Sequence, residues 1–541
     1  MRATCFLCSV VFTMLFFSIE TNAQTIFRTY TTLSGFYDYQ SNGAVNQYIR
    51  VCPTSGNMHA IYMIAFDSSA GGLNNSRRTA YAFSSNGGLT WNNFSNVTVP
   101  ARRSGFPTLD LMRGRYACLP VIANHSVNTS LLQSSLFVDS PEGCGCFSEL
   151  NAPPLIGGDE PIWPEIACTS DGAIVMVAST QASCRTYIWR IDSVYRPPKI
   201  VEGVCGGRNV AEASLTDSGR VGVALGNPQQ INVGMYFYES TDNGITWPNL
   251  PTYILPSIFT VGTDSFQTYP SLDFAYKHNN PVISFTVFNG RLTGTDRAGI
   301  GFWSPPTGFV LAVPHNAISG VADSMNKTQR NHLTVGYPAI AMSGSNIVIV
   351  FQVFMQDTSA RGFNYSEVLY TYSSNNGTSW SSPRNITNTR FLDERYPSIS
   401  KWNANGQINL VYQEDTAPGL AAFPGDGSDT VRTKQVFCRV SDFTLDVNEK
   451  NTPPLQFALE QNYPNPFNPS TTLSFVIGHS SFVILKVYDV LGREVATLVN
   501  EVKAPGEHVV QFEANNLSSG VYYYRLSAGS FIQTKKMILI R

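Results

Sequence analysis

Five carboxylates and four basic side chains stand out by their type and by their place in the chain. Each of them precedes a segment in which an alternating or apolar run begins. Two carboxyl groups can act together as the general acid and the general base that cleave a glycosidic bond. Arginine and histidine can hold the carboxylate or hydroxyl groups of a ligand. The acidic candidates are Asp159, Glu160, Asp264, Asp393 and Glu394, and the basic ligand-binding candidates are Arg103, Arg208, His332 and Arg395.

The segments that follow these candidates form an internal repeat. Two looser copies begin at Tyr48 and Val210, and from Tyr48 to Tyr396 the copies recur about every 58 residues, which suits a four-stranded blade with long loops. The repeat predicts an all-β fold, a seven-bladed β-propeller, with six blades as the alternative if the copy near Val210 belongs to its neighbour. Five copies begin with an aromatic–proline pair: Phe106-Pro107, Trp163-Pro164, Tyr269-Pro270, Tyr337-Pro338 and Tyr396-Pro397.

Pairing of residues 26–30 beside residues 435–439 would close the ring and remove its exposed edge. The loops that precede the innermost strands would then open around one end of the central channel, a usual place for a ligand. The candidate side chains therefore gather at that end. The alternative is that charged residues simply favour exposed loops.

A second motif occurs in three of the repeats, after an alternating strand. It resembles the Asp-box, Ser-x-Asp-x-Gly-x-Thr-Trp, of sialidase-like propellers. The acid or amide accepts backbone N–H bonds in a turn, glycine supplies a positive φ, and tryptophan packs between blades. The resemblance implies a propeller fold rather than an activity, because the box lies opposite the sialidase active site. Its structural residues here are Ser84, Asn86, Gly88, Trp91, Ser240, Asp242, Gly244, Trp247, Ser373, Asn375, Gly377 and Trp380.

The resemblance to sialidases is weaker at the substrate-binding arginines. Such enzymes carry an Arg-Ile-Pro near the first inner strand, whereas this chain has Arg50-Val51-Cys52-Pro53, with one residue inserted. Two functions from different classes remain. The chain is either a propeller that binds a glycan or a protein partner, which the altered arginine motif favours, or a sialidase-like or other glycan-degrading hydrolase. A converging acidic pair with three arginines would favour the enzyme, and an uncharged or plugged channel would favour the binder.

The four aromatic residues Trp163, Tyr269, Tyr337 and Tyr396 also admit two interpretations. They suit a sugar-binding surface, because an aromatic face beside polar groups is typical of such sites. Because all four hold the same position in the repeat, packing between blades is the alternative.

The last part of the chain, residues 459–541, has the pattern of a small, separate antiparallel β-domain. Its proline-rich opening cannot enter a sheet interior, and the later runs are rich in β-branched and aromatic residues. These runs include Val487-Tyr488-Asp489-Val490-Leu491-Gly492-Arg493 and Gly520-Val521-Tyr522-Tyr523-Tyr524. The segment resembles the type A C-terminal sorting domain of the type IX secretion system. That resemblance implies an immunoglobulin-like β-sandwich sorting domain and the secretion machinery as a partner; an ordinary immunoglobulin-like appendage is the alternative.

The beginning of the chain agrees with export. Residues 1–23 combine a basic start, a short apolar run and a small-residue cleavage site, which predicts a signal peptide. The expected organisation is therefore a signal peptide (1–23), a β-propeller (24–448), a linker (449–458) and the sorting domain (459–541). We expect a secreted or outer-surface protein.

Composition excludes several other classes of function. Charged residues make up 14% of the chain and the formal net charge is −2, so there is no basic excess for nucleic acid. No later run reaches the length of a transmembrane segment. Eight of the ten cysteines follow the signal peptide and allow disulfides, without a zinc-binding spacing. We expect no metal and no cofactor, because motifs for metalloprotease, esterase and phosphate chemistry are missing.

Overall fold

The computed structural model describes residues 24–540 apart from several short segments. The predicted signal peptide (1–23) and nearly all of the predicted linker (449–457) lie outside the described residues. The segments left out are 42–46, 70, 95, 114–117, 129–130, 151–152, 205, 207, 217, 227–233, 257, 262–263, 290–296, 328, 330–331, 390, 424–426, 444–457, 463, 478–480, 504–505 and 529–530.

The chain divides into two compact units. One comprises Asn22–Leu445, and the other includes Asp446–Arg541. Strands dominate both units, and the only helices in the described residues are two short turns, α1 (Gly72–Asn75) and η1 (His315–Ala317), which both lie in the larger unit.

The described residues of the larger unit form seven antiparallel sheets. The first four contain β2 (Ile49–Val51), β3 (Met58–Ile64) and β4 (Arg78–Ser84); β5 (Ser104–Arg113), β6 (Cys118–Asn128), β7 (Leu131–Asp139) and β8 (Phe147–Leu150); β9 (Ile162–Cys168), β10 (Ile174–Ser179), β11 (Arg185–Ile191) and β12 (Lys199–Glu202); and β13 (Asn209–Ala213), β14 (Val221–Gly226), β15 (Met235–Ser240) and β16 (Thr252–Leu255).

The other three sheets complete the larger unit. The fifth contains β17 (Ile258–Val261), β18 (Asp264–Lys277), β19 (Asn280–Asn289), β20 (Arg297–Ser304) and β21 (Gly308–Val313); the sixth contains β22 (Val335–Ser343), β23 (Asn346–Thr358), β24 (Asn364–Ser373) and β25 (Arg384–Asn385); the seventh contains β26 (Asp393–Ile399), β27 (Gln407–Asp415), β28 (Thr433–Ser441) and β1 (Thr25–Gly35).

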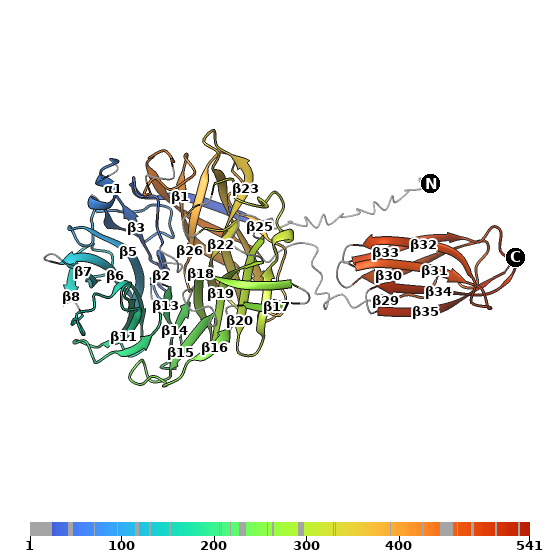
Figure 1. The fold of residues 1–541 in the computed structure, drawn as a ribbon, viewed down its shortest axis with the longest axis horizontal. Coiled ribbons are helices and arrows are strands. Elements are labelled where there is room, and N and C mark those ends of the chain that lie inside the picture. The colour runs from blue at the N-terminus through green and yellow to red at the C-terminus, as the bar shows by residue number, and fades with distance from the viewer. Residues whose placement is uncertain are drawn as a thin grey trace, which may run out of the picture. The chain divides into compact units, whose positions relative to one another are not determined.

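The seven sheets are arranged in a ring around a set of inner strands (Figure 1). The inner strands β2, β5, β9, β13, β18, β22 and β26 each contact the next in this order, and β26 contacts β2. The sheets therefore act as the blades of a β-propeller, the fold class that the sequence predicts. The exact number of blades stays a prediction, which the seven sheets support.

The first strand of the chain closes the ring. β1 pairs antiparallel with β28, so that Phe27 faces Arg439 and Thr29 faces Phe437. This is the pairing that the sequence predicts. A disulfide between Cys52 and Cys118 adds a covalent link between the first and second sheets.

Apolar side chains fill the space between neighbouring sheets. In β10 all six residues are buried, because this strand has a packed neighbour on each face. Such strands read as continuous apolar runs, in contrast to strands with one solvated face. The core is thus distributed between blades and leaves the channel to other residues.

The three Asp-box-like turns share one hydrogen-bond pattern. In the turn after β15, Gly244 N–H donates to Ser240 Oγ at 2.9 Å, and Thr246 N–H donates to Asp242 Oδ1 at 2.9 Å. The turns after β4 and β24 repeat both bonds at 2.8–3.0 Å, with Asn86 and Asn375 as acceptors. The amide keeps the acceptor that the turn needs, as expected from the sequence. Membership of the Asp-box family stays a prediction.

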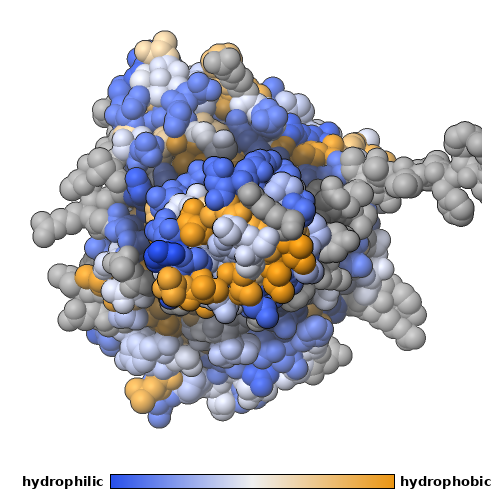
Figure 2. Space-filling model, turned by 90° about the vertical axis from the view of Figure 1, so that its right-hand side faces the viewer, coloured by the Kyte–Doolittle hydropathy of each residue, from blue (hydrophilic) through white to orange (hydrophobic). Residues whose placement is uncertain are grey.

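The smaller unit is built from two facing sheets. One contains β29 (Ala458–Leu459), β30 (Ser470–Ile477) and β33 (Gly506–Glu513), and the other contains β32 (Glu494–Lys503), β31 (Ser481–Tyr488), β34 (Gly520–Ala528) and β35 (Phe531–Leu539). β30 alternates between buried and partly exposed residues, the pattern of a strand with one face in a core. Apolar side chains also gather at the end of this unit that faces the viewer in Figure 2. Because β31 and β35 both pair antiparallel with β34, they finish at the same end of the sheet, where Val490, Leu491 and Ile540 are exposed.

Candidate functional site

The aromatic residue of the aromatic–proline pair has an unusual backbone conformation in four blades. Phe106, Trp163, Tyr337 and Tyr396 have φ angles of 47°, 55°, 51° and 52°. Each lies beside a shift of register between the inner strand and its neighbour. Positive φ is uncommon outside glycine, and a bulge redirects the side chain that it carries. In these four blades the repeat therefore turns one aromatic ring away from the regular pleat.

These rings differ in how much solvent they meet. Phe106, Tyr337 and Tyr396 are buried, with exposed fractions of 8%, 3% and 4%. The rings of Tyr337 and Tyr396 lie 5.1 Å apart, and His332 lies 5.0 Å and 5.5 Å from them. The predicted ligand residue His332 is thus itself buried among aromatic rings. In this part of the ring the packing interpretation of the aromatic residues holds.

Around the fourth inner strand the same end of the ring is more open. Trp163 and Tyr269, from the third and fifth blades, are only half-buried, and so is Arg208, which precedes β13. Burial raises the pKa of Tyr269, and the positive charge of Arg208 acts against that rise. Asn209 Nδ2 donates to Trp163 O at 3.3 Å. We call Trp163, Arg208 and Tyr269 the half-buried trio; they lie in or directly before three consecutive inner strands, β9, β13 and β18.

Two of the predicted carboxylates are sealed inside the seventh blade. Asp393 and Arg395 form an ion pair in which neither side chain is exposed by more than 1%. Asp393 also accepts hydrogen bonds from Ser366 N–H at 2.9 Å and Ser366 Oγ at 2.7 Å, and Arg395 donates to Gln329 Oε1 at 2.6 Å. Glu394 is also buried, and burial raises its pKa to about 8.

Two more buried acids, Asp38 and Asp415, interact electrostatically with Arg395. Ala421 and Ala422 donate their N–H groups to the carboxylate of Asp38. Burial raises the pKa of Asp38 to about 6, and burial together with Asp393 raises the pKa of Asp415 well above its usual range. The prediction that Asp393, Glu394 and Arg395 face an open channel mouth does not fit this burial. The reason is tertiary: residues from other parts of the chain, Ser366 and Gln329 among them, bind these side chains.

The other predicted carboxylates lie in different surroundings. Asp159 accepts a hydrogen bond from Tyr187 Oη at 2.5 Å and lies 3.5 Å from Arg185, while Glu160 is exposed. Burial first, and then Asp159, raises the pKa of Tyr187 to about 12, which keeps this phenol neutral. Within the described residues, no hydrogen bond or ion pair joins Asp159, Asp264 or Asp393 to one another.

Asp264 lies beside a small cavity on the fifth blade. The cavity has a volume of about 170 Å³, and Arg297 and His315 also line it. Burial lowers the pKa of His315, so this imidazole is mainly neutral near pH 7. The last basic candidate, Arg103, donates from Nε to Asn74 O at 2.9 Å. The structure therefore distributes the nine candidates over several places rather than one.

A charged network inside the channel was not predicted. Arg50 lies 3.0 Å from Asp110 and 2.9 Å from Glu212, which come from the second and fourth inner strands. Gln47 extends the network: it accepts from Arg50 Nη1 at 2.6 Å and donates to Asp273 at 2.8 Å, and Asp273 also accepts from Lys401 Nζ at 2.5 Å. Arg50, the counterpart of the sialidase arginine, thus pairs within the protein. Single charges inside otherwise apolar inner strands were the signal that could have revealed this network.

Comparison with known proteins identifies the C-terminal unit. Residues 461–540 match the family described as the secretion system C-terminal sorting domain. The chain thus carries a type IX sorting domain, which directs it to the cell surface or the extracellular space. No helix in the described part of the chain is long and apolar enough to cross a membrane. Among curated proteins, none matches this chain.

Several solved structures resemble the chain at low identity. A polysaccharide lyase, Uly1, is 9% identical with a TM-score of 0.43, over 75% of this chain and 92% of its own. An exo-beta-1,3-galactanase from Phanerochaete chrysosporium is 10% identical with a TM-score of 0.31, over 94% and 99%. An alpha-L-arabinanase from Penicillium chrysogenum is 10% identical with a TM-score of 0.35, over 62% and 93%. Likeness at this level carries no information about the ligand of this chain.

Proposed function

We propose that the protein is an exported β-propeller that binds a glycan through Trp163, Arg208 and Tyr269. One observation carries the proposal. Of the repeated aromatic residues, Trp163 and Tyr269 on the two inner strands next to the fourth are half-buried, and so is Arg208 directly before the fourth, whereas Phe106, Tyr337 and Tyr396 are buried. Aromatic faces with a few polar groups are typical of small-molecule sites, and a guanidinium supplies donors for hydroxyl or carboxylate oxygens.

A glycan-degrading hydrolase is the second candidate. The cavity that brings Asp264 together with Arg297 and His315 supports it, because it supplies one acid with two possible ligand-binding groups. Against it, Asp393 is buried in an ion pair with Arg395, and the Tyr187 phenol has a raised pKa instead of the lowered one that an activated nucleophile needs. Glycoside hydrolysis by two carboxyl groups also requires both to flank one bond.

Glycan-array binding by the exported protein tests the proposal, with hydrolysis of fluorogenic glycosides measured in parallel. Trp163→Ala and Arg208→Gln should each weaken binding about tenfold, corresponding to about 1.4 kcal/mol. Tyr253→Ala, which removes an exposed aromatic ring from β16, should leave binding unchanged. Unaltered binding in both site variants would contradict the proposal. Turnover that is lost in Asp264→Ala would instead establish the hydrolase.

A further inference from the structure

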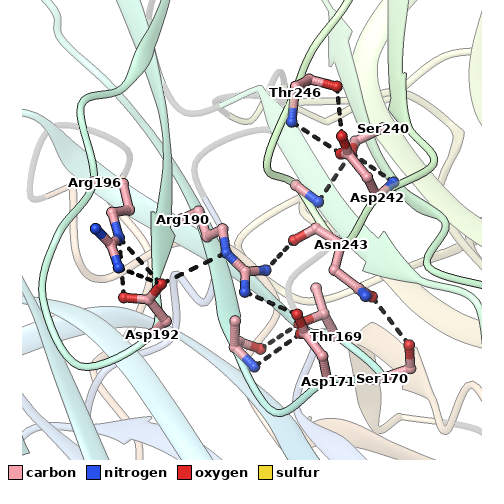
Figure 3. A network of polar contacts seen from close by, with 12 residues as sticks. Thr169, Ser170, Asp171, Arg190, Asp192, Arg196, Ser240, Asp242, Asn243 and Thr246 are labelled. Carbon is pink, nitrogen blue, oxygen red and sulfur yellow. Dashed lines mark hydrogen bonds and ion pairs between the residues drawn. The ribbon is translucent and has the colours of Figure 1, made fainter.

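A larger cavity lies between the third and fourth blades, at the end opposite to the half-buried trio. Trp163 lies near the start of β9, and the turn of Thr169–Asp171 follows the end of the same strand. The Asp-box-like turn of the fourth blade packs against this second turn (Figure 3). The cavity has a volume of about 410 Å³, within the usual range of small-molecule sites. Its lining residues are Ile188, Arg190, Asp192, Arg196, Pro197, Lys199, Gly244, Ile245 and Trp247.

Arg190 fixes one wall of this cavity. Its guanidinium lies 2.8 Å from Asp171 and donates to the carbonyl oxygen of Asn243, whose side chain accepts from Ser170 Oγ at 3.0 Å (Figure 3). These contacts bind the turn of the fourth blade to the third blade. The cavity is therefore preformed, and the charge of Arg190 is already matched by Asp171.

A second arginine on the wall is also matched. Arg196 Nη2 lies 2.9 Å from Asp192 Oδ2, and Arg196 Nε donates to the same carboxylate (Figure 3). The remaining cation is Lys199, whose ammonium lies 4.9 Å from the centre of the Tyr238 ring. Among the described residues Lys199 takes part in no ion pair. The three cations of the lining thus carry one positive charge more than Asp171 and Asp192 neutralise.

The rest of the lining is apolar. Trp247 Nε1 donates to Gly244 O at 3.2 Å, which uses the single hydrogen-bond donor of the indole. The indole can therefore contact a ligand only through its apolar ring. Ile245 beside it is 63% exposed, and Ile188 and Pro197 complete the apolar surface. An indole face next to a single unmatched ammonium fits a compact ligand with one carboxylate and apolar C–H faces.

We propose that this cavity binds a uronate residue of an acidic polysaccharide, with Lys199 on the carboxylate and Trp247 against the sugar ring. The site is separate from the trio of the proposed function, because it lies at the other end of the third and fourth blades. An acidic peptide would match the charge of Lys199, whereas the sugar ring also matches the indole face. The ligand therefore needs both a carboxylate and a pyranose ring.

Isothermal titration of the full exported protein with polygalacturonate tests the proposal. Lys199→Gln should weaken binding about tenfold, as expected for the loss of a charged hydrogen bond of about 1.4 kcal/mol. Arg196→Gln should have a smaller effect in the same direction, because this guanidinium is shared with Asp192. The matched control is Lys434→Gln, which removes a lysine that lies 5.0 Å from the centre of the Tyr30 ring on the seventh blade. This control should bind as the parent does.

Three further probes separate the possible ligands. Methyl-esterified polygalacturonate keeps the sugar and loses the charge, so it should bind at least tenfold more weakly. Equal binding of the ester, or of polyglutamate, would overturn the assignment to uronate. Binding of a sulfated galactan in place of polygalacturonate would do the same. Trp163→Ala should leave polygalacturonate binding unchanged, so failure here and failure of the proposed function are distinguishable.

Discussion

The charged residues of the central channel and those of the cavity between the third and fourth blades differ in how their charges are neutralised. In the channel, Arg50 lies between Asp110 and Glu212, and Lys401 lies on Asp273, all with exposed fractions of 8% or less. In the cavity, the arginines are matched and Lys199 is left over. Buried charges must be paired, because an unpaired charge away from water is costly. An unpaired charge on a solvent-accessible cavity wall can instead bind a ligand of opposite charge.

In this chain, which is poor in charge, the paired residues of the channel serve the fold, whereas Lys199 serves binding. The channel network joins inner strands from different blades, and its charges are satisfied within the protein. Changes in the network should affect stability, and changes at Lys199 should affect binding.

Removal of Asp273 should have the largest effect. Asp273→Ala leaves the ammonium of Lys401 buried without its acid, and breaking a buried pair in this way costs about 3–5 kcal/mol. Urea denaturation followed by tryptophan fluorescence measures the loss in the free energy of unfolding. The control is Asp429→Ala, which breaks the exposed pair with Arg361 and should cost about 1 kcal/mol or less. Equal losses in the two variants would show that the channel pair has no special role.

A pH titration should give the next largest effect. Burial raises the pKa of Asp38 to about 6, of Glu212 to about 7 and of Glu394 to about 8. These neutral acids stabilise the fold at low pH, and this contribution is lost as the pH rises through each folded-state pKa. We expect the free energy of unfolding to fall between about pH 5 and pH 9.

One variant isolates the part of Glu394 in this titration. Glu394→Gln should flatten the fall above about pH 6, because the amide cannot ionise. Glu160→Gln, at an exposed position, should leave the curve unchanged. A parent-like slope in Glu394→Gln would mean that this carboxyl group meets water in the folded protein.

The smallest effect is expected at the turn that forms a wall of the cavity. Asp242→Ala removes the acceptor for Thr246 N–H and Thr246 Oγ and should lower stability by about 1 kcal/mol. Asp242→Asn should cost less, because Asn86 and Asn375 accept the equivalent bonds in the other two turns. Thermal unfolding measures both. A loss in Asp242→Asn as large as in Asp242→Ala would show that charge, rather than acceptor geometry, holds this turn.

The fold was predictable from the sequence to the extent that it depends on local patterns. The aromatic–proline pairs and the three Asp-box-like turns recur along the chain, so the propeller could be expected. The β1–β28 closure could be expected as well, because it removes the exposed edge of the ring. The sorting domain could be recognised because its pattern is continuous in the chain. The boundaries of the predicted signal peptide and linker remain predictions.

The candidate site depended on contacts that no local pattern encodes. Asp393 and Arg395 lie at the start of an inner strand and Arg208 lies directly before one, yet the former two are fully buried and Arg208 is half-buried. Lys199 gave no signal in the sequence, because only the assembled blades show that it forms no ion pair with any described residue. Burial and pairing of charges are properties of the assembled ring.

The pairing of β1 with β28 also sets an order of events. The two strands are about four hundred residues apart in the chain, so loop closure of this length must precede their contact. Until Thr433–Ser441 is available, both β1 and β27 keep an unpaired edge. The propeller thus becomes a closed body only after almost its whole length is present. A chain cut short before the seventh blade would expose strand edges and invite aggregation or proteolysis.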